Sequence, residues 1–212
     1  MEIELKYKIK DKDLFNEILE DEYLIGLEEK GSREEALFKA AYFDTDDGVL
    51  AKNDIAFRVR TEGARVVATL KWNDTTSGAL YVREEINVPV SDMSCFLNPS
   101  PELFKESDMG KDLLELLNGK TLRNVLEMRF VRKKMKIDTG GAICEVALDD
   151  GEIVTDMGNL HISELEIELF SGDRSQMIEV GEKLAEKYGL EAESESKYAR
   201  GLRFLAQGGP AA

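Results

Sequence analysis

The sequence predicts an α+β fold in which about eight antiparallel strands can close into a barrel with flanking helices. Segments that alternate strictly between apolar and polar residues recur along the chain, and this period of two is typical of half-buried strands. Turn signals separate several of these segments, whereas apolar residues at helical spacing are confined to the connections and the C-terminal region. Closing eight strands into a barrel would leave no exposed sheet edge.

The N-terminal half supplies the first five expected strands. Residues 2–10 alternate most strictly, and Asp11 can cap a helix over about residues 12–22. The turn signal Asp46-Asp47-Gly48 ends the second strand, and Glu62-Gly63 joins a hairpin. The strands expected after the helix cover residues 37–45, 55–61, 64–72 and 80–90.

The second half begins with a different pattern. After Asn98-Pro99-Ser100-Pro101, leucines recur at helical spacing, so we expect two helices inserted over about residues 91–124. A last helix is expected to begin near Ser171-Gly172-Asp173 and to end at about residue 188. Further strands are expected over about residues 127–138, 142–149, 153–155 and 161–170. These elements are expected to form one domain over residues 1–206, followed by a disordered tail over residues 207–212.

Composition argues against several classes of protein. Apolar residues make up 42% of the chain, and no apolar run approaches the ~20 residues that a membrane-spanning helix needs. A net charge of -15 argues against nucleic-acid binding through bulk electrostatics. Cys95 and Cys144 lack metal-binding spacing, and no disulfide between them is expected. We therefore expect a cytoplasmic protein with no signal peptide and no membrane or nucleic-acid partner, either a monomer or a homodimer.

Charged residues concentrate on one face of successive strands. Residues two apart in a strand share a face, so each set below points to one side of the expected sheet. The acidic strands near the two ends of the chain contribute Glu2 and Glu4 with Lys6, and Glu164, Glu166 and Glu168. The strands between them contribute Arg58 and Arg60, Lys71, Arg83 and Glu85, Arg132 and Lys134, and Glu145 and Asp149.

Two arrangements are compatible with these charged faces. The charges can lie outside in water with apolar residues filling the barrel, or they can line the lumen beneath an outer wall that helices cover. In a lumen, two carboxylates 4 Å apart repel by ~4 kcal/mol at an effective dielectric of about 20, so an acidic cluster would hold a divalent cation or lose its ionisation. Oxygen ligands favour Mg²⁺ or Mn²⁺, and Arg and Lys suit phosphate. The pattern alone does not choose between the two arrangements.

A series of short motifs runs through the chain in one order. It begins with Glu2-Ile3-Glu4-Leu5-Lys6 and ends with Ser196-Lys197-Tyr198-Ala199-Arg200-Gly201. Between them lie Tyr42-Phe43-Asp44-Thr45, Arg58-Val59-Arg60, Thr69-Leu70-Lys71, Arg83-Glu84-Glu85, Ala147-Leu148-Asp149-Asp150-Gly151 and Glu164-Leu165-Glu166-Ile167-Glu168. The series resembles the CYTH superfamily, the triphosphate tunnel metalloenzymes. The resemblance implies a single CYTH domain and the second arrangement, a closed eight-stranded barrel around a charged tunnel.

The resemblance also implies roles for particular residues. The implied ligands of a Mg²⁺ or Mn²⁺ ion are Glu2, Glu4, Glu164, Glu166 and Glu168. The implied phosphate-binding residues are Lys6, Arg58, Arg60, Lys71, Arg83, Arg132, Lys134, Lys197 and Arg200. The implied catalytic residues are Lys6, which would also hold the carboxylates in place, and Glu85 and Asp149, which would orient basic side chains or help to place a second metal ion.

A few positions have less definite roles. The strand containing Arg129 and Arg132 matches the family only loosely, and Lys134 favours Arg132 because these two share a face. His161, the single histidine, is expected at the surface or at a strand entry. Trp72 and Tyr81 are expected to be packing residues.

The function that the resemblance implies is metal-dependent hydrolysis of the terminal phosphate of a triphosphate bound in the tunnel. Inorganic tripolyphosphate is the preferred small-molecule substrate, because the expected lumen groups suit phosphate and none reads a base or a thiazole; nucleoside triphosphates and thiamine triphosphate are further options. An adenylyl cyclase of the same superfamily, which makes cyclic AMP from ATP, is the first alternative. A non-catalytic polyphosphate-binding module is the second.

Overall fold

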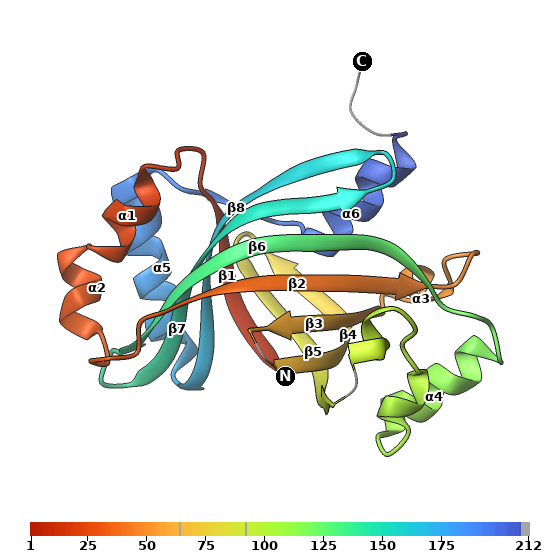
Figure 1. The fold of residues 1–212 in the computed structure, drawn as a ribbon. Helices are drawn as coiled ribbons and strands as arrows, with labels where there is room; N and C mark the ends of the chain where they lie inside the picture. The colour runs from red at the N-terminus through yellow and green to blue at the C-terminus, as the bar shows by residue number, and fades with distance from the viewer. Residues whose placement is uncertain (64, 92, 209–212) are drawn as a thin grey trace.

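The strands of the protein form one closed antiparallel barrel, as seen in a computed structural model that describes residues 1–63, 65–91 and 93–208. The strands follow one another around the barrel in the order β5-β4-β3-β2-β6-β7-β8-β1, and pairing of β1 with β5 closes it (Figure 1). This confirms the predicted α+β class and the eight-stranded barrel. The barrel strands are β1 (Glu2–Lys8), β2 (Glu34–Asp44), β3 (Ala56–Glu62), β4 (Arg65–Ser77), β5 (Leu80–Val90), β6 (Arg123–Asp138), β7 (Ala142–Thr155) and β8 (Gly158–Gly172).

The remaining elements connect or flank these strands. A short strand, β9 (Glu191–Ala192), pairs with the end of β1. The helices are α1 (Leu14–Leu19), α2 (Glu22–Leu27), α3 (Val49–Lys52), α4 (Asp108–Leu117), α5 (Arg174–Tyr188) and α6 (Lys197–Ala206), with 3₁₀ turns at Met93–Phe96 and Pro101–Phe104. None of the helices in the described part of the chain is long and apolar enough to cross a membrane.

Several predicted elements differ from the structure. The single helix expected over residues 12–22 is two short helices, because Asp21 has an extended backbone and its side chain caps α2 by accepting from Tyr23 N and Leu24 N. The insertion expected to hold two helices holds α4 and two 3₁₀ turns. The two strands expected over residues 142–149 and 153–155 are one continuous strand, β7. The helix α6 was not assigned from the sequence, and the expected tail lies mostly in residues 209–212, outside the described residues.

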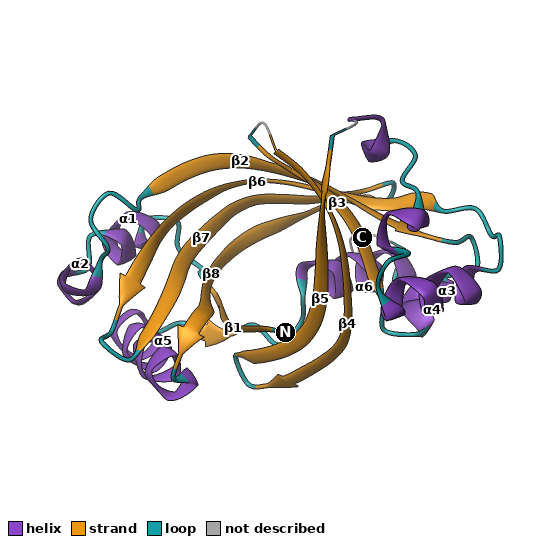
Figure 2. Ribbon diagram, turned by 90° about the horizontal axis from the view of Figure 1, so that it is seen from below, coloured by secondary structure: helices purple, strands orange, loops and turns teal. Residues whose placement is uncertain are grey.

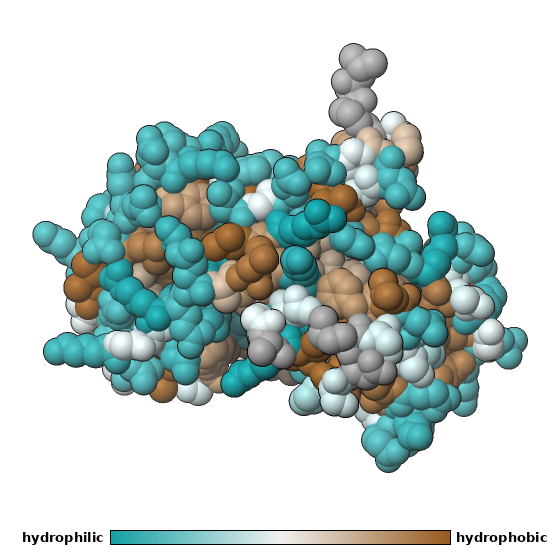
Figure 3. All heavy atoms as spheres, in the orientation of Figure 1, coloured by the Kyte–Doolittle hydropathy of each residue, from teal (hydrophilic) through white to brown (hydrophobic). Residues whose placement is uncertain are grey.

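Apolar side chains on the outer wall of the barrel are covered by helices on two flanks. On one flank α1, α2 and α5 cover β1 and the adjoining halves of β6, β7 and β8, where Ile18, Leu24 and Leu184 are buried (Figures 1 and 2). On the other flank α3 and α4 cover β2 to β5, where Phe57 packs edge-on against Phe104 at 5.4 Å. Figure 3 shows mainly hydrophilic residues over the face of the molecule that includes α1 and α2. Because apolar residues seal the outside, the opposite face of every strand points inward.

Helix α6 packs against the inside of the barrel wall at one end. Ser196 caps it by accepting a hydrogen bond from Ala199 N at 3.1 Å. Gly201 allows the close approach, since a Cβ at this position would lie 2.4 Å from Leu126 Cδ2. The helix thereby brings Lys197 at its start into the lumen, where this side chain is buried.

A close contact between β6 and β7 yields a stability prediction. A Cβ on Gly151 would lie 2.1 Å from the Arg129 carbonyl oxygen and 2.4 Å from Phe130 Cα, both backbone atoms that cannot turn aside. Gly151→Ala is therefore expected to lower the free energy of unfolding by about 1–3 kcal/mol. Gly26→Ala is the control, because a Cβ there meets nothing within 4 Å and lies in helix α2. Equal denaturation midpoints for the two variants would contradict the prediction.

Candidate active site

The barrel lumen carries the charged faces of the strands. A cavity of about 430 Å³ runs through it, and the buried or half-buried residues around it include both acidic and basic side chains. The second of the two arrangements that the sequence allowed is therefore the one adopted. Thirteen of the expected site residues line this cavity: Glu2, Glu4, Lys6, Arg58, Arg60, Lys71, Arg83, Glu85, Arg132, Lys134, Glu166, Glu168 and Lys197.

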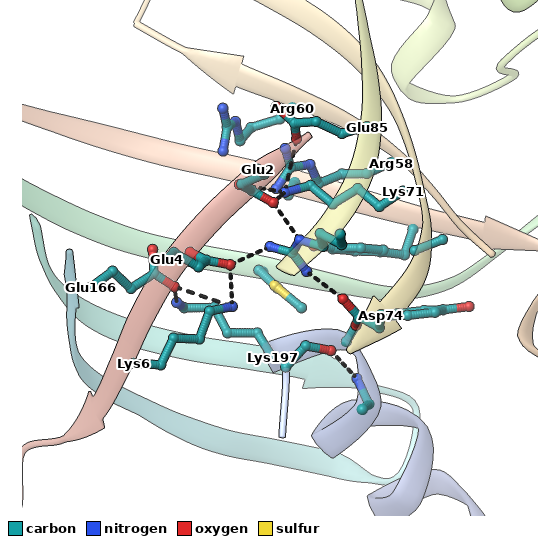
Figure 4. Close-up of a pocket in the computed structure, with 18 of the residues that line it drawn as sticks. Glu2, Glu4, Lys6, Arg58, Arg60, Lys71, Asp74, Glu85, Glu166 and Lys197 are labelled. Atoms are coloured by element: carbon teal, nitrogen blue, oxygen red, sulfur yellow. Dashed lines mark hydrogen bonds and ion pairs between the residues drawn. The ribbon is translucent and has the colours of Figure 1, made fainter. Parts of the chain in front are cut away.

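The carboxylates of β1 are held by basic residues of β4 and β5 (Figure 4). Glu2 accepts from Lys71 Nζ at 2.8 Å and from Arg83 Nε. Glu4 accepts from Arg83 Nη2 at 2.6 Å and pairs with Lys6 Nζ at 3.0 Å. Burial opposes the ionisation of Glu2, but the charges of Lys71 and Arg83 outweigh it and hold the pKa of Glu2 well below its ordinary value. This carboxylate is consequently ionised at neutral pH.

A second ion cluster joins β6, β7 and β8 to helix α6. Arg132 donates to both oxygens of Asp149 at 2.7 Å and also contacts Glu166. Lys197 Nζ lies 2.7 Å from Glu166 Oε1 and 2.7 Å from Glu164 Oε2. Burial opposes the charged form of Lys197, yet the adjacent carboxylates, Glu164 first, raise its pKa well above the ordinary value. The cluster thus holds the side chains of Arg132 and Lys197 in the lumen and attaches α6 to the barrel.

Glu168 is the carboxylate with the least compensation. It lies directly across from Glu4 on β1 and from Glu145 on β7. Among the described residues it has no hydrogen bond or ion pair to a basic side chain, and the more distant charge of Lys71 only partly offsets its acidic neighbours. Burial, followed by the negative charges of Glu2 and Glu4, raises the pKa of Glu168 to about 7. Negative charge is therefore in excess around Glu168, and carboxylates that face one another across strands destabilise their pairing.

The carboxylate oxygens around Glu168 are compatible with a hard divalent cation. Glu2, Glu4 and Glu168 offer only carboxylate oxygens, which Mg²⁺ and Mn²⁺ prefer. Within the described residues no three acidic, histidine or cysteine side chains converge on one point. The carboxylate of Glu2 is paired with Lys71 and Arg83. A cation beside Glu168 would compete for that carboxylate and relieve the negative excess, so the residues suit a metal ion.

Two arginines on β3 are suited to bind an anion. The Nε atoms of Arg58 and Arg60 are buried and have no hydrogen-bond partner. Burial, followed by the positive charge of Arg58, lowers the pKa of Arg60 to about 10, although Glu62 acts in the opposite direction. Arg60 remains protonated at neutral pH, and both arginines line the cavity, where their guanidinium groups are suited to an anion.

The structure places the remaining expected site residues behind the cavity wall. Asp149 and Glu164, fully or almost fully buried, hold Arg132 and Lys197 from behind. Arg200 binds Glu164 and Glu193 and does not line the cavity. These three residues therefore form ion pairs with one another or with the basic residues of the lumen and do not face the cavity.

The residues with less definite sequence roles are also placed. Arg132 faces the lumen with 12% of its side chain exposed, whereas Arg129 lies outside with 58% exposed. His161 is half exposed and pairs with Asp150 on the outside of the barrel. Trp72 packs against the apolar core around Phe57, and Tyr81 is buried.

Sequence analysis missed two groups of lumen residues. Asp54 and Asp74 lie at the cavity, where Asp54 Oδ2 accepts from Asp74 N at 3.0 Å and a bulge in β4 interrupts the alternation. No period-two pattern could place them, because both lie next to irregular backbone. The aromatic residues Phe38 and Phe130 also line the cavity. Phe130 shares a face with Arg132, a signal that was present in the sequence, whereas the neighbours of Phe38 on its face are Ala36 and Ala40.

The chain belongs to the CYTH family: the description of the CYTH domain matches residues 1–202. Members of this family bind triphosphates in the barrel and are generally metal-dependent. An inorganic triphosphatase from Haemophilus influenzae is 29% identical over 160 residues, which are 76% of this chain and 44% of that protein. The chain thus spans less than half the length of that relative.

Solved structures share the fold across the whole chain. A putative adenylyl cyclase from Hippeastrum, described as having a dominant triphosphatase activity, superposes with a TM-score of 0.70 at 21% identity and covers 100% of this chain and 98% of its own. A protein from Pyrococcus horikoshii has a TM-score of 0.57 at 19% identity, covering 96% of this chain and 99% of its own. At these identities the likeness concerns the fold.

The ion cluster around Asp149 yields a second stability prediction. Asp149→Asn removes the buried charge that balances Arg132 and Lys197, and is expected to lower the free energy of unfolding by about 3 kcal/mol. Asp108→Asn, which loosens an exposed pair with Lys111, is the control and should leave the denaturation midpoint unchanged. A midpoint for Asp149→Asn equal to that of the control would show that the cluster contributes nothing to stability.

Proposed function

We propose that the protein hydrolyses the terminal phosphate of inorganic tripolyphosphate, or of a closely related triphosphate, in the barrel lumen. The observation that carries this proposal is that Arg58 and Arg60, whose Nε atoms have no partner among the described residues, line the same cavity as Glu168, a half-buried carboxylate without an ion pair of its own. The arginines of β3 suit an anion, and the carboxylates around Glu168 suit a cation. A metal-bound triphosphate supplies both charges.

The basic residues of the lumen would hold the phosphate chain. Arginine side chains bind phosphate oxygens through two parallel donors, and lysine acts as a compact point charge. Hydrolysis forms a bond between water oxygen and the terminal phosphorus and breaks the bond to the bridging oxygen, which releases phosphate and diphosphate. The positive charge of Arg58, Arg60 and Arg132 would stabilise the negative charge that the departing diphosphate acquires.

The acidic residues of β1 and β8 would hold the cofactor. Glu2, Glu4 and Glu168 are the proposed ligands, with Glu166 as a further one, and Mg²⁺ or Mn²⁺ would neutralise phosphate oxygens and activate a water molecule. Lys6 lies 3.0 Å from Glu4 and 3.7 Å from Glu166. It can therefore keep the two carboxylates in position and contact a phosphate oxygen. Glu85, 3.1 Å from Lys71, would orient that lysine.

Phosphate release from tripolyphosphate and from ATP, measured with Mg²⁺, with Mn²⁺ and with a chelator, tests the proposal. We expect release from tripolyphosphate that requires the metal and exceeds release from ATP, because the charged residues that line the lumen suit phosphate groups. Cyclic AMP and diphosphate formed from ATP, with no release from tripolyphosphate, would instead identify a cyclase. Binding of tripolyphosphate without any turnover would identify a binding module.

Glu4→Gln tests the assignment of the metal ligands. The variant keeps the shape of the side chain but removes its charge, so turnover is expected to fall by about a hundredfold or more. Glu127→Gln is the matched control, since Glu127 is a glutamate on the outside of β6 with 42% of its side chain exposed. Circular dichroism should show that both variants keep the fold. Undiminished turnover in Glu4→Gln would remove this residue from the proposed metal site.

A further inference from the structure

Two phenylalanines form a stacked pair inside the charged tunnel. Phe38 on β2 and Phe130 on β6 are direct cross-strand partners, and their ring centroids lie 5.3 Å apart with an interplanar angle of 12°. Both side chains are almost fully buried and both line the cavity. We propose that this pair positions the basic side chains that bind the anionic substrate. The inference rests on the proposed function and concerns residues that the sequence motifs do not include.

Basic groups from three different elements surround the pair. The guanidinium carbon of Arg60 lies 5.3 Å from the ring centroid of Phe38. That of Arg132 lies 5.4 Å from the centroid of Phe38 and 5.7 Å from that of Phe130. Lys197 Nζ lies 5.6 Å from the centroid of Phe130. All of these distances are within the ~6 Å over which the face of an aromatic ring attracts a cation.

The chemistry of the ring explains why an aromatic pair is useful at this place. A carboxylate beside Arg60 would hold the guanidinium but would also use its N–H donors and neutralise its charge. A ring face attracts the cation through its quadrupole and leaves the donors at the edge of the guanidinium plane for phosphate. Arg60 pairs with one carboxylate, Glu62, and its Nε is without a partner. Glu62 holds the guanidinium of Arg60 through one Nη atom and the ring of Phe38 lies under its face, so the two together orient an arginine whose Nε has no partner among the described residues.

A second phenylalanine pair, on β2 and β3, shows what a purely structural pair looks like. Phe43 on β2 and Phe57 on β3 are also cross-strand partners, with centroids 6.0 Å apart, and are as deeply buried. They belong to the apolar core under α4, and in the described part of the chain no basic side chain lies over either ring. This pair provides a control that matches the lumen pair in residue type and burial.

The experiment compares Phe38→Leu, Phe38→Tyr and Phe57→Leu with the unaltered protein. Binding of tripolyphosphate is measured by isothermal titration calorimetry in the presence of chelator, and kcat and KM are measured with Mg²⁺. We expect Phe38→Leu to bind about tenfold more weakly and to raise KM more than it lowers kcat, since it removes the ring while keeping an apolar side chain. Phe38→Tyr keeps the ring and should bind as the unaltered protein does. Phe57→Leu should lower thermal stability without changing affinity.

The outcomes separate this inference from the proposed function. Equal affinity of Phe38→Leu and the unaltered protein overturns the positioning role, and so does equal weakening in Phe38→Leu and Phe38→Tyr. If the unaltered protein binds tripolyphosphate without hydrolysing it, the proposed function fails and the ring effect on affinity still decides the inference. If it does not bind tripolyphosphate at all, both fail. Phe130→Leu replaces Phe38→Leu as the ring-deleted variant if the latter does not fold.

Discussion

The balance of charge inside a closed, apolar-walled barrel is the constraint on which the rest of the structure depends. Unpaired charges removed from water destabilise a protein by several kcal/mol each, so the lumen can exist only as a paired network. Lys197, bound to Glu164 and Glu166, shows the consequence for the fold. The pairing attaches α6 to the inside of the barrel, and Gly201 provides the space that the helix needs.

The charges of this network compensate one another fully in one part of the lumen and only partly in another. This difference connects the fold to the proposed function. Around Asp149 the charges compensate one another and support the barrel. Around Glu168 negative charge is in excess, and on β3 the buried Nε atoms of Arg58 and Arg60 have no partner. A paired cluster stabilises the folded state, whereas an unpaired group is stabilised when a ligand of opposite charge arrives. The barrel thus contains a paired cluster around Asp149 that maintains the fold, and less fully paired groups at which the proposed ligand would bind.

Aromatic residues take part in the same balance. Phe38 and Phe130 lie in the lumen among charged residues and other apolar side chains such as Met128. Their ring faces lie against the guanidinium groups of Arg60 and Arg132, which also pair with carboxylates. The outward pair, Phe43 on β2 and Phe57 on β3, packs in the apolar core. The side of the strand on which a phenylalanine lies therefore decides whether it packs or positions a cation.

The sequence by itself determined the strands, their two faces and most of the residues that meet in the lumen, because period-two alternation depends only on the local backbone. Glu2, Glu4, Arg58 and Arg60 could be grouped in this way. The face shared with Lys134 also favoured Arg132 over Arg129, and Arg132 lies in the lumen. Only the tertiary structure decided which face points inward and that Asp74 reaches the cavity from a bulge. Closure of the barrel is a long-range pairing of β1 with β5, and no local pattern encodes which side of a strand it encloses.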